Sequence, residues 1–421
     1  MEIIMEKKNI VILAMFAILC SALIVGIIVF YIYDTHKQVN DLQDTGCGLT
    51  QEDDISQPYW NSPNHTFTKG IGGYYFYNPV SRMIMFFDSK EKIMYPVCGK
   101  PDCNHDDTSC NAYLDHSYNM SVYFYKDSLY LLRTGENGDI ILVQEALDGS
   151  TRKDLFEIGT GTGNTLQPIY LAFFDNAVYI VDLHDNAFLK NEDGSTKIRK
   201  RTLDGKDDSI IASFSGPDVQ IENLKIYNQQ VYFTLKSYSS DKDTRTNTFF
   251  GKGLYTYNPQ DESVIQLTDD DVWDYTIDSV NKIMYLYIKG DALYKCDLSN
   301  IKDSKEMLYA ASSDSLFCNI SYDGKYLYLD NSIASNTSYT GNGNKIPIKL
   351  LILDTKGNTI NSIALGSDIM FGDPNYIFIG LGGATGTSSS KGKINWKSTN
   401  WGYINKDDIT QTQTISEIKS E

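Results

Sequence analysis

Short stretches in which apolar and polar residues alternate run through the chain from about residue 65 to its end. Within them, a triplet of an apolar, an aromatic and another apolar residue recurs roughly every 50 residues, a period typical of propeller blades. Alternation of this kind predicts half-buried strands. The seven triplets lie at 74–76, 129–131, 178–180, 231–233, 284–286, 327–329 and 377–379.

Further strand patterns flank the triplets. A short apolar strand precedes six of them and ends in a turn of Asp, Asn or Gly, which tolerate the positive φ of tight hairpins. A third and a fourth strand follow each triplet, with turns such as Asp148-Gly149 between them. Four-stranded units of this kind predict an all-β chain folded as a single seven-bladed β-propeller. Six or eight blades remain open, because repeat one has an inner strand only if residues 65–69 supply it. A two-sheet sandwich or a β-solenoid is the alternative architecture.

This repeat of aromatic strand, Asp/Asn turn, Leu-Tyr strand and Asp-Gly turn covers residues 66–420. It resembles the extracytoplasmic propellers of the low-density-lipoprotein-receptor type and the TolB type. The segment VCGKPDCNHDDTSCNA is similar to a Cys-rich insert of uncharacterised membrane-anchored or lipoprotein propellers of Firmicutes. The resemblance implies a fold and a compartment rather than a reaction.

The N-terminal region differs from the repeats in that residues 10–33 contain no charge. This run is long enough to cross a bilayer as a helix and longer than the apolar part of a cleavable signal peptide. Lys7 and Lys8 precede it and favour a cytoplasmic N-terminus. The sequence therefore predicts a cytoplasmic tip (1–9), a single-pass signal anchor in the cell membrane (10–33), a stalk (34–64) and an extracytoplasmic propeller (65–421).

The formal net charge is −17 at pH 7, and all of the excess lies after the apolar run. Nucleic acid is bound through Lys/Arg-rich faces, so an acidic exported part makes it an unfavoured partner. A solvated acidic surface explains the charge without any ligand. A cationic ligand or a wall polymer is the alternative.

Three cysteines and a histidine form the most specific local pattern, Cys98-x4-Cys103-x-His105-x4-Cys110. Three thiolates and an imidazole can complete a structural zinc site. Oxidising compartments favour disulfides instead, and Cys47 in the stalk would then be a fourth partner. We therefore predict either disulfides, for example Cys103 with Cys110 and Cys47 with Cys98, or a zinc site in this insert.

Long insertions follow the second strand of several repeats, at 184–194, 237–252, 331–347 and 380–400. In a propeller these loops emerge on the same face as the connections between blades, which include the Cys-rich insert. Insertions on one face often mark a binding surface, and aromatic side chains there can stack on sugars or anchor a partner. The candidate binding residues are Tyr238, Phe249, Phe250, Tyr339, Trp396 and Trp401.

Catalytic motifs are lacking: the chain has no Gly-x-Ser-x-Gly elbow, no His-Glu-x-x-His and no phosphate-binding loop. The sequence favours a non-enzymatic binding or interaction module that engages a protein or a cell-surface polysaccharide. The alternative function is a glycan or peptide hydrolase with carboxylates around the propeller channel.

Overall fold

The computed structural model describes residues 66–78, 81–114, 121–135, 139–160, 170–181, 195–216, 219–241, 246–310, 319–331, 348–365, 369–380, 387–388, 394–395, 401–411 and 415–420. All of them belong to one compact unit, Gln51–Glu421. The predicted membrane span at 10–33, the stalk and Cys47 lie outside the described residues. Within the described part of the chain, no helix is long and apolar enough to cross a bilayer.

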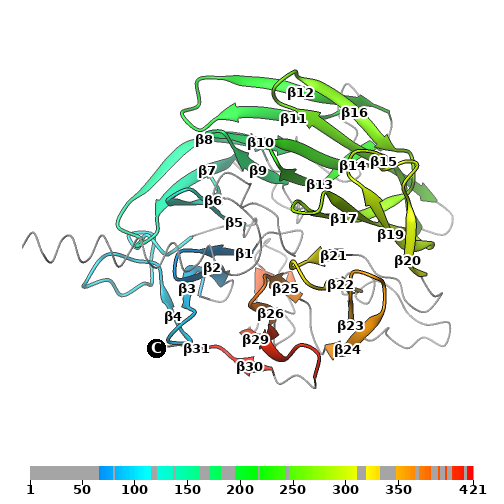
Figure 1. The fold of residues 1–421 in the computed structure, drawn as a ribbon. Coiled ribbons are helices and arrows are strands. Elements are labelled where there is room, and N and C mark those ends of the chain that lie inside the picture. Colours follow the sequence, from blue (N-terminus) through cyan, green and yellow to red (C-terminus); the bar gives the residue numbers. More distant parts are fainter. Residues whose placement is uncertain are drawn as a thin grey trace, which may run out of the picture. The chain divides into compact units, whose positions relative to one another are not determined.

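Seven antiparallel four-stranded sheets follow one another along the described chain and form the seven blades of a propeller (Figure 1). The first three blades are β1 (Phe67–Gly70), β2 (Gly73–Asn78), β3 (Met83–Asp88) and β4 (Ile93–Pro96); β5 (Val122–Tyr125), β6 (Ser128–Thr134), β7 (Asp139–Ala146) and β8 (Arg152–Thr160); and β9 (Leu171–Phe174), β10 (Ala177–Val181), β11 (Ser195–Thr202) and β12 (Asp208–Ser215).

The remaining blades have the same order of strands. They are β13 (Val219–Tyr227), β14 (Gln230–Asp241), β15 (Thr246–Asn258) and β16 (Ser263–Thr268); β17 (Val272–Asp278), β18 (Ile283–Ile288), β19 (Ala292–Asp297) and β20 (Glu306–Ala310); β21 (Asn319–Tyr322), β22 (Leu327–Asp330), β23 (Ile348–Leu353) and β24 (Thr359–Leu365); and β25 (Ile369–Gly372), β26 (Tyr376–Gly380), β29 (Trp401–Asn405) and β30 (Ser416–Glu417). A two-stranded ribbon of β27 (Thr387–Ser388) and β28 (Ile394–Asn395) and the 3-10 turn η1 (Lys406–Asp408) accompany blade 7. The predicted blade number of seven is confirmed, and β1 is the inner strand of repeat one.

The apolar core consists of seven clusters, one in the seam between each pair of neighbouring blades. This arrangement explains the triplet in the sequence. On β6, Leu129 and Leu131 face blade 1, whereas Tyr130 between them faces blade 3. The same rule holds in all seven second strands, because successive side chains of a strand point to opposite faces. The alternation thus reflects two apolar seams rather than a core on one side and water on the other.

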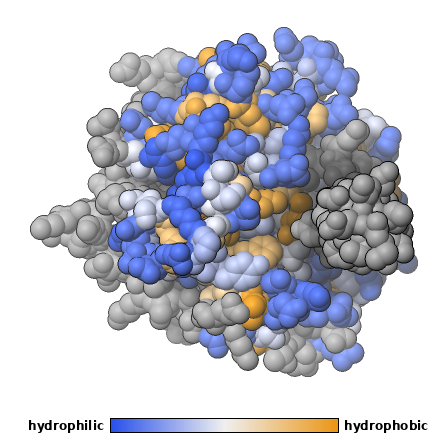
Figure 2. Space-filling view, turned by 90° about the vertical axis from the view of Figure 1, so that its left-hand side faces the viewer, coloured by the Kyte–Doolittle hydropathy of each residue, from blue (hydrophilic) through white to orange (hydrophobic). Residues whose placement is uncertain are grey.

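The outer strands carry more polar residues and face solvent. Viewed from the side of β4, β7 and β8, the surface is mainly hydrophilic, with apolar residues visible between the polar ones (Figure 2). The turn between the third and fourth strands of a blade packs on the outer strand of the preceding blade. At Gly149 (φ 67°) a Cβ would lie 2.3 Å from the Val97 carbonyl oxygen of blade 1. Only glycine allows both this conformation and this approach.

Charged groups reinforce the seams near the inner strands. Lys225 of blade 4 pairs with Asp274 of blade 5 at 2.8 Å, and both side chains are about nine-tenths buried. The second oxygen of Asp274 accepts the backbone N–H of Ile320 in blade 6 at 2.9 Å. One carboxylate therefore links three successive blades.

Blade 7 meets blade 1 through the end of the chain. After β30 the chain crosses to blade 1, where β31 (Lys419–Ser420) pairs in parallel with β4 as a fifth strand. Ile418, next to β31, is buried in the seam between blades 7 and 1. Below it, Asp373 of blade 7 accepts the Tyr74 hydroxyl at 2.6 Å and pairs with Lys69 at 3.0 Å. This added strand was not predicted from the sequence.

We expect Lys225→Met to lower the free energy of unfolding by about 3–5 kcal/mol, because it leaves the Asp274 carboxylate buried without its counter-ion. The control Arg133→Met breaks the exposed pair between Arg133 and Asp154 and should cost about 1 kcal/mol or less. Urea unfolding of both variants, followed by fluorescence, measures the difference. Similar losses of unfolding free energy in the two variants would contradict a stabilising role of the Lys225–Asp274 pair between blades.

Candidate metal centre

The Cys-rich insert is the connection between β4 of blade 1 and β5 of blade 2. Both of its ends are hydrogen-bonded to the beginning of β3. At the first end, the N–H of Val97 donates to the Ile84 carbonyl at 2.9 Å; at the other, the N–H of Ile84 donates to the Ala112 carbonyl at 2.8 Å. Between these anchors, residues 98–110 form a loop at the seam of blades 1 and 2. The fold thus closes a short loop around the four predicted ligands.

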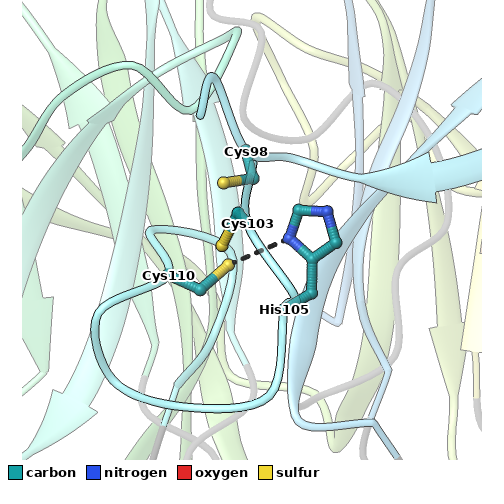
Figure 3. A group of neighbouring side chains, drawn as sticks. All are labelled: Cys98, Cys103, His105 and Cys110. Atoms are coloured by element: carbon teal, nitrogen blue, oxygen red, sulfur yellow. Dashed lines mark hydrogen bonds between the residues drawn. The ribbon is translucent and has the colours of Figure 1, made fainter. Parts of the chain in front are cut away.

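The four predicted ligand side chains converge in this loop. One ligand atom from each of Cys98, Cys103, His105 and Cys110 lies within 4.8 Å of the other three. The three sulfurs and the imidazole point toward one another (Figure 3), and His105 Nδ1 is 3.3 Å from Cys110 Sγ. Zinc–sulfur bonds of about 2.3 Å place the sulfurs of a tetrahedral site about 3.8 Å apart. This arrangement can hold a metal ion.

The described cysteines form no disulfide: Cys98, Cys103, Cys110 and Cys296 are free. A disulfide needs two sulfurs about 2.05 Å apart, and the predicted bond between Cys103 and Cys110 is not present. Its suggested companion, Cys47, lies outside the described residues. Cys296 is buried in blade 5, away from the insert.

Local backbone geometry directs the ligands inward. The Asp107 side chain accepts the N–H of Ser109 at 2.7 Å, and the Asp107 carbonyl accepts the N–H of Cys110 at 3.1 Å, which forms a tight turn before the last ligand. His105 has a φ of 57°, in the left-handed region that His adopts more readily than most residues. The Lys100 ammonium donates to the Ser109 carbonyl across the loop.

The surroundings of the loop shift the pKa values of Cys98 and Cys110 in opposite directions. Burial opposes charge on Cys98, but hydrogen bonds from the Lys100 N–H and from the other two thiols outweigh it and lower the pKa of Cys98. Burial and hydrogen bonding with Cys103 and Cys98 raise the pKa of Cys110 to about 12, although the N–H groups of Ala112 and Tyr113 oppose this rise. Without a metal, these surroundings therefore favour ionisation of Cys98 over ionisation of Cys110. A bound cation overrides this preference, because coordinated thiols lose their protons.

Side chains of blade 2 and of the insert hydrogen-bond to each other's backbone carbonyls. Arg152 Nη1 donates to the Tyr113 carbonyl at 2.9 Å, and Asn111 Nδ2 donates to the Gly149 carbonyl at 2.7 Å. Arg152 is held in turn by Glu145, whose Oε2 lies 2.9 Å from Nε and 2.8 Å from Nη2. The Glu145 side chain is fully buried, and its Oε1 atom has no hydrogen-bond partner.

Glu145 and Arg152 were not predicted from the sequence, although the pattern of β7 carries a signal for Glu145. Ile141, Val143 and Glu145 alternate along β7, and the first two contribute to the apolar cluster between blades 1 and 2. The same alternation places Glu145 on a buried face, where a carboxylate needs a partner. The basic run at 197–201 on β11 was also passed over; its Arg199 and Arg201 pair with Asp208.

The predicted aromatic binding residues have different fates. Phe250 on β15 is 48% exposed. Trp401 is only 4% exposed and packs against Phe67 and Phe76, with ring centroids 5.1 and 5.9 Å away. Its ring belongs to the seam between blades 7 and 1, because alternation along β29 places Trp401 and Tyr403 on the face toward blade 1. Tyr238 and Phe249 lie on β14 and β15, but their side chains are outside the described part of the structure, as are the residues Tyr339 and Trp396.

Carboxylates near the propeller axis bear on the alternative hydrolase hypothesis. Three of those on or next to the described inner strands are matched by a lysine: Glu222 by Lys236 at 2.6 Å, and Asp274 and Asp373 by the lysines named above. The pairs of Asp274 and Asp373 join neighbouring blades, whereas Glu222 and Lys236 both belong to blade 4.

Comparison with known proteins supports the fold alone. No family model matches the chain, and no curated protein matches it. A structure from a study of two prolyl endopeptidases is similar with a TM-score of 0.53 at 11% identity, over 87% of this chain and 50% of that one. The chain thus spans about half the length of that protein. A nidogen/laminin complex (TM-score 0.37, 11% identity, 69% of this chain and 94% of that one) and the WD40 domain of Toxoplasma gondii coronin (0.40, 8%, 73% and 71%) are more distant, and their likeness carries no functional information.

Glu145 should give stability a characteristic pH dependence. Burial raises the pKa of Glu145 to about 7, although Arg152 works in the opposite direction. Because the unfolded chain releases this proton near pH 4.5, the proton's stabilising effect is complete below that pH and is lost as the pH rises through 7. Relative to Glu145→Gln, the wild type should therefore lose on the order of 2–3 kcal/mol between pH 5 and pH 8. Urea unfolding at several pH values measures this change, and parallel profiles of the two proteins would contradict it.

Proposed function

We propose that this chain is a non-enzymatic interaction module, anchored in the cell membrane by residues 10–33, whose propeller lies outside the cytoplasm and binds a protein or a cell-surface glycan. The uncharged run at 10–33 supports the anchor, and Lys7 and Lys8 before it support the orientation. The propeller fold supports the binding role, because it offers a broad face built from many loops.

One observation favours a particular binding face. The hairpin of β14 and β15 is longer than its neighbours: residues 238–241 pair only with 246–249, beyond the ends of β13 and β16. It extends from blade 4 on the side where second strands pass to third strands, and connections between blades emerge on that same side. Phe250 stands at the base of this extension and is half-exposed. We infer that this hairpin projects toward the ligand.

The metal that we propose for the insert is zinc. Three sulfur donors and one imidazole nitrogen are a soft set, which favours zinc over magnesium or calcium. Four protein ligands leave no position open for a substrate, so the role is structural rather than catalytic. The same chemistry explains why three cysteines and one histidine converge without forming a disulfide. The ion would hold the connection between blades 1 and 2 in one conformation on the binding face.

The binding role predicts that Phe250→Ala weakens retention of the ligand about tenfold, the loss expected when an exposed aromatic anchor is truncated. Val280→Ala is the control, because Val280 is also exposed but lies in the turn between β17 and β18, at the opposite end of the strands. Two assays measure this with the full-length protein in detergent. The first is a pull-down on isolated cell-wall glycan, and the second is crosslinking to surface proteins. Equal retention by both variants would remove the hairpin from the binding site.

Zinc binding predicts about one zinc per chain in the purified full-length protein, measured by elemental analysis. Cys98→Ser should lose the ion because it removes a ligand, whereas Cys296→Ala should keep it. Mass spectrometry after thiol alkylation supplies the opposing outcome. Disulfide-linked Cys98, Cys103 and Cys110 in a metal-free protein would overturn the zinc assignment and leave the binding role to be judged on the hairpin.

A further inference from the structure

The turn of blade 2 at 147–152 contacts both ends of the loop at 98–110, which we call the metal loop. At the first end, Gly149 packs so closely on Val97 and Cys98 that a Cβ would lie 2.7 Å from the Cys98 Cα. At the other end, the Gly149 carbonyl accepts the Asn111 side chain and Arg152 donates to the Tyr113 carbonyl. This one turn therefore fixes the spacing between the first ligand, Cys98, and the last, Cys110.

Tyr113 carries the contact on to the metal ligand. Its N–H donates to the Cys110 carbonyl at 3.2 Å, and its own carbonyl accepts Arg152 Nη1. A shift of Arg152 would thus move the residue that is hydrogen-bonded to the backbone of the ligand Cys110. Groups that orient metal ligands in this way commonly change metal affinity on the order of 10–100-fold when they are removed.

Glu145 fixes Arg152 in place. The two residues are direct cross-strand partners on β7 and β8, and Arg152 is 17% exposed while Glu145 is fully buried. Burying a carboxylate with one oxygen unpartnered is costly. The pair holds the Arg152 guanidinium in one orientation, in which Nη1 donates to the Tyr113 carbonyl.

We propose that Arg152, held by Glu145, is a positioning residue for the Cys98–Cys103–His105–Cys110 site, so that the seam between blades 1 and 2 sets how tightly the metal is retained. This inference rests on the proposed zinc site. By thermodynamic reciprocity, the bound metal also stabilises the seam. The metal loop and blade 2 therefore act as one unit, and metal occupancy stiffens this part of the binding face.

The test compares zinc release from full-length variants to a competing chromophoric chelator. Arg152→Gln should release zinc about 10–100-fold faster than the wild type, and Glu145→Gln should shift in the same direction. Arg133→Gln is the matched control, since Arg133 pairs with Asp154 on β8 without contacting the insert, and it should release zinc at the wild-type rate. The cobalt(II)-loaded variants should keep a tetrahedral thiolate spectrum, which shows that all four ligands still bind. Release from Arg152→Gln at the wild-type rate would overturn the proposal.

A second measurement covers variants that fail to fold. Asn111→Ala removes the other tether without touching Arg152, and it should also speed zinc release. In the wild type, chelation should accelerate amide hydrogen exchange at the β7–β8 turn but not at the β19–β20 turn of blade 5. Unchanged exchange at both turns would refute the coupling. A wild-type protein that takes up no zinc would instead overturn the zinc site itself, and the positioning role with it.

Discussion

Ring closure is the constraint on which the rest of this structure depends. A blade with an apolar cluster on each face is stable only when it has a neighbour on both sides, so the first and last blades must find each other. Six seams join blades that follow one another directly along the chain. The seventh joins chain segments about 300 residues apart, and it depends on aromatic packing of Phe67 with Phe378 and Trp401, on the buried Asp373, and on β31. Losing these contacts would expose apolar faces on both blades 1 and 7.

Because each seam has its own core, the seams can differ in chemistry. A buried ion pair joins blades 4 and 5, its carboxylate accepts a backbone N–H of blade 6, and Lys406 of blade 7 pairs with Asp323 of blade 6 at 3.2 Å. The seam of blades 1 and 2 combines apolar packing with the Cys-rich insert and the Arg152 contact. The acidic turns along the chain serve mainly as hairpin caps, as Asp354 does by accepting the N–H groups of Lys356 and Asn358.

The fold was largely predictable because its cause is local. Every second strand places one aromatic ring in one seam and two apolar residues in the other, so the triplet reports the seam directly. Contacts that depend on ring closure leave no such periodic signal. β31 pairs with β4 through only two residues. The burial of the Trp401 side chain depends on which face of β29 it lies on. Glu145 was missed for a related reason. A charged residue is usually expected to be exposed to solvent, and only the alternation along β7 indicates that this one is buried.

The residues of the Cys-rich cluster were predictable from the sequence, but their chemistry was not. The spacing of Cys98, Cys103, His105 and Cys110 allows both a disulfide knot and a metal site, since both need a short loop that brings thiols together. The distances between the sulfur atoms distinguish a disulfide from a metal site. These distances depend on how blade 2 packs against the loop. Three thiols also cannot all pair within the loop, whereas one tetrahedral ion uses all three together with His105. The four side chains lie close enough together to share one ion, and Arg152, at the start of β8, contacts the end of the loop through the Tyr113 carbonyl.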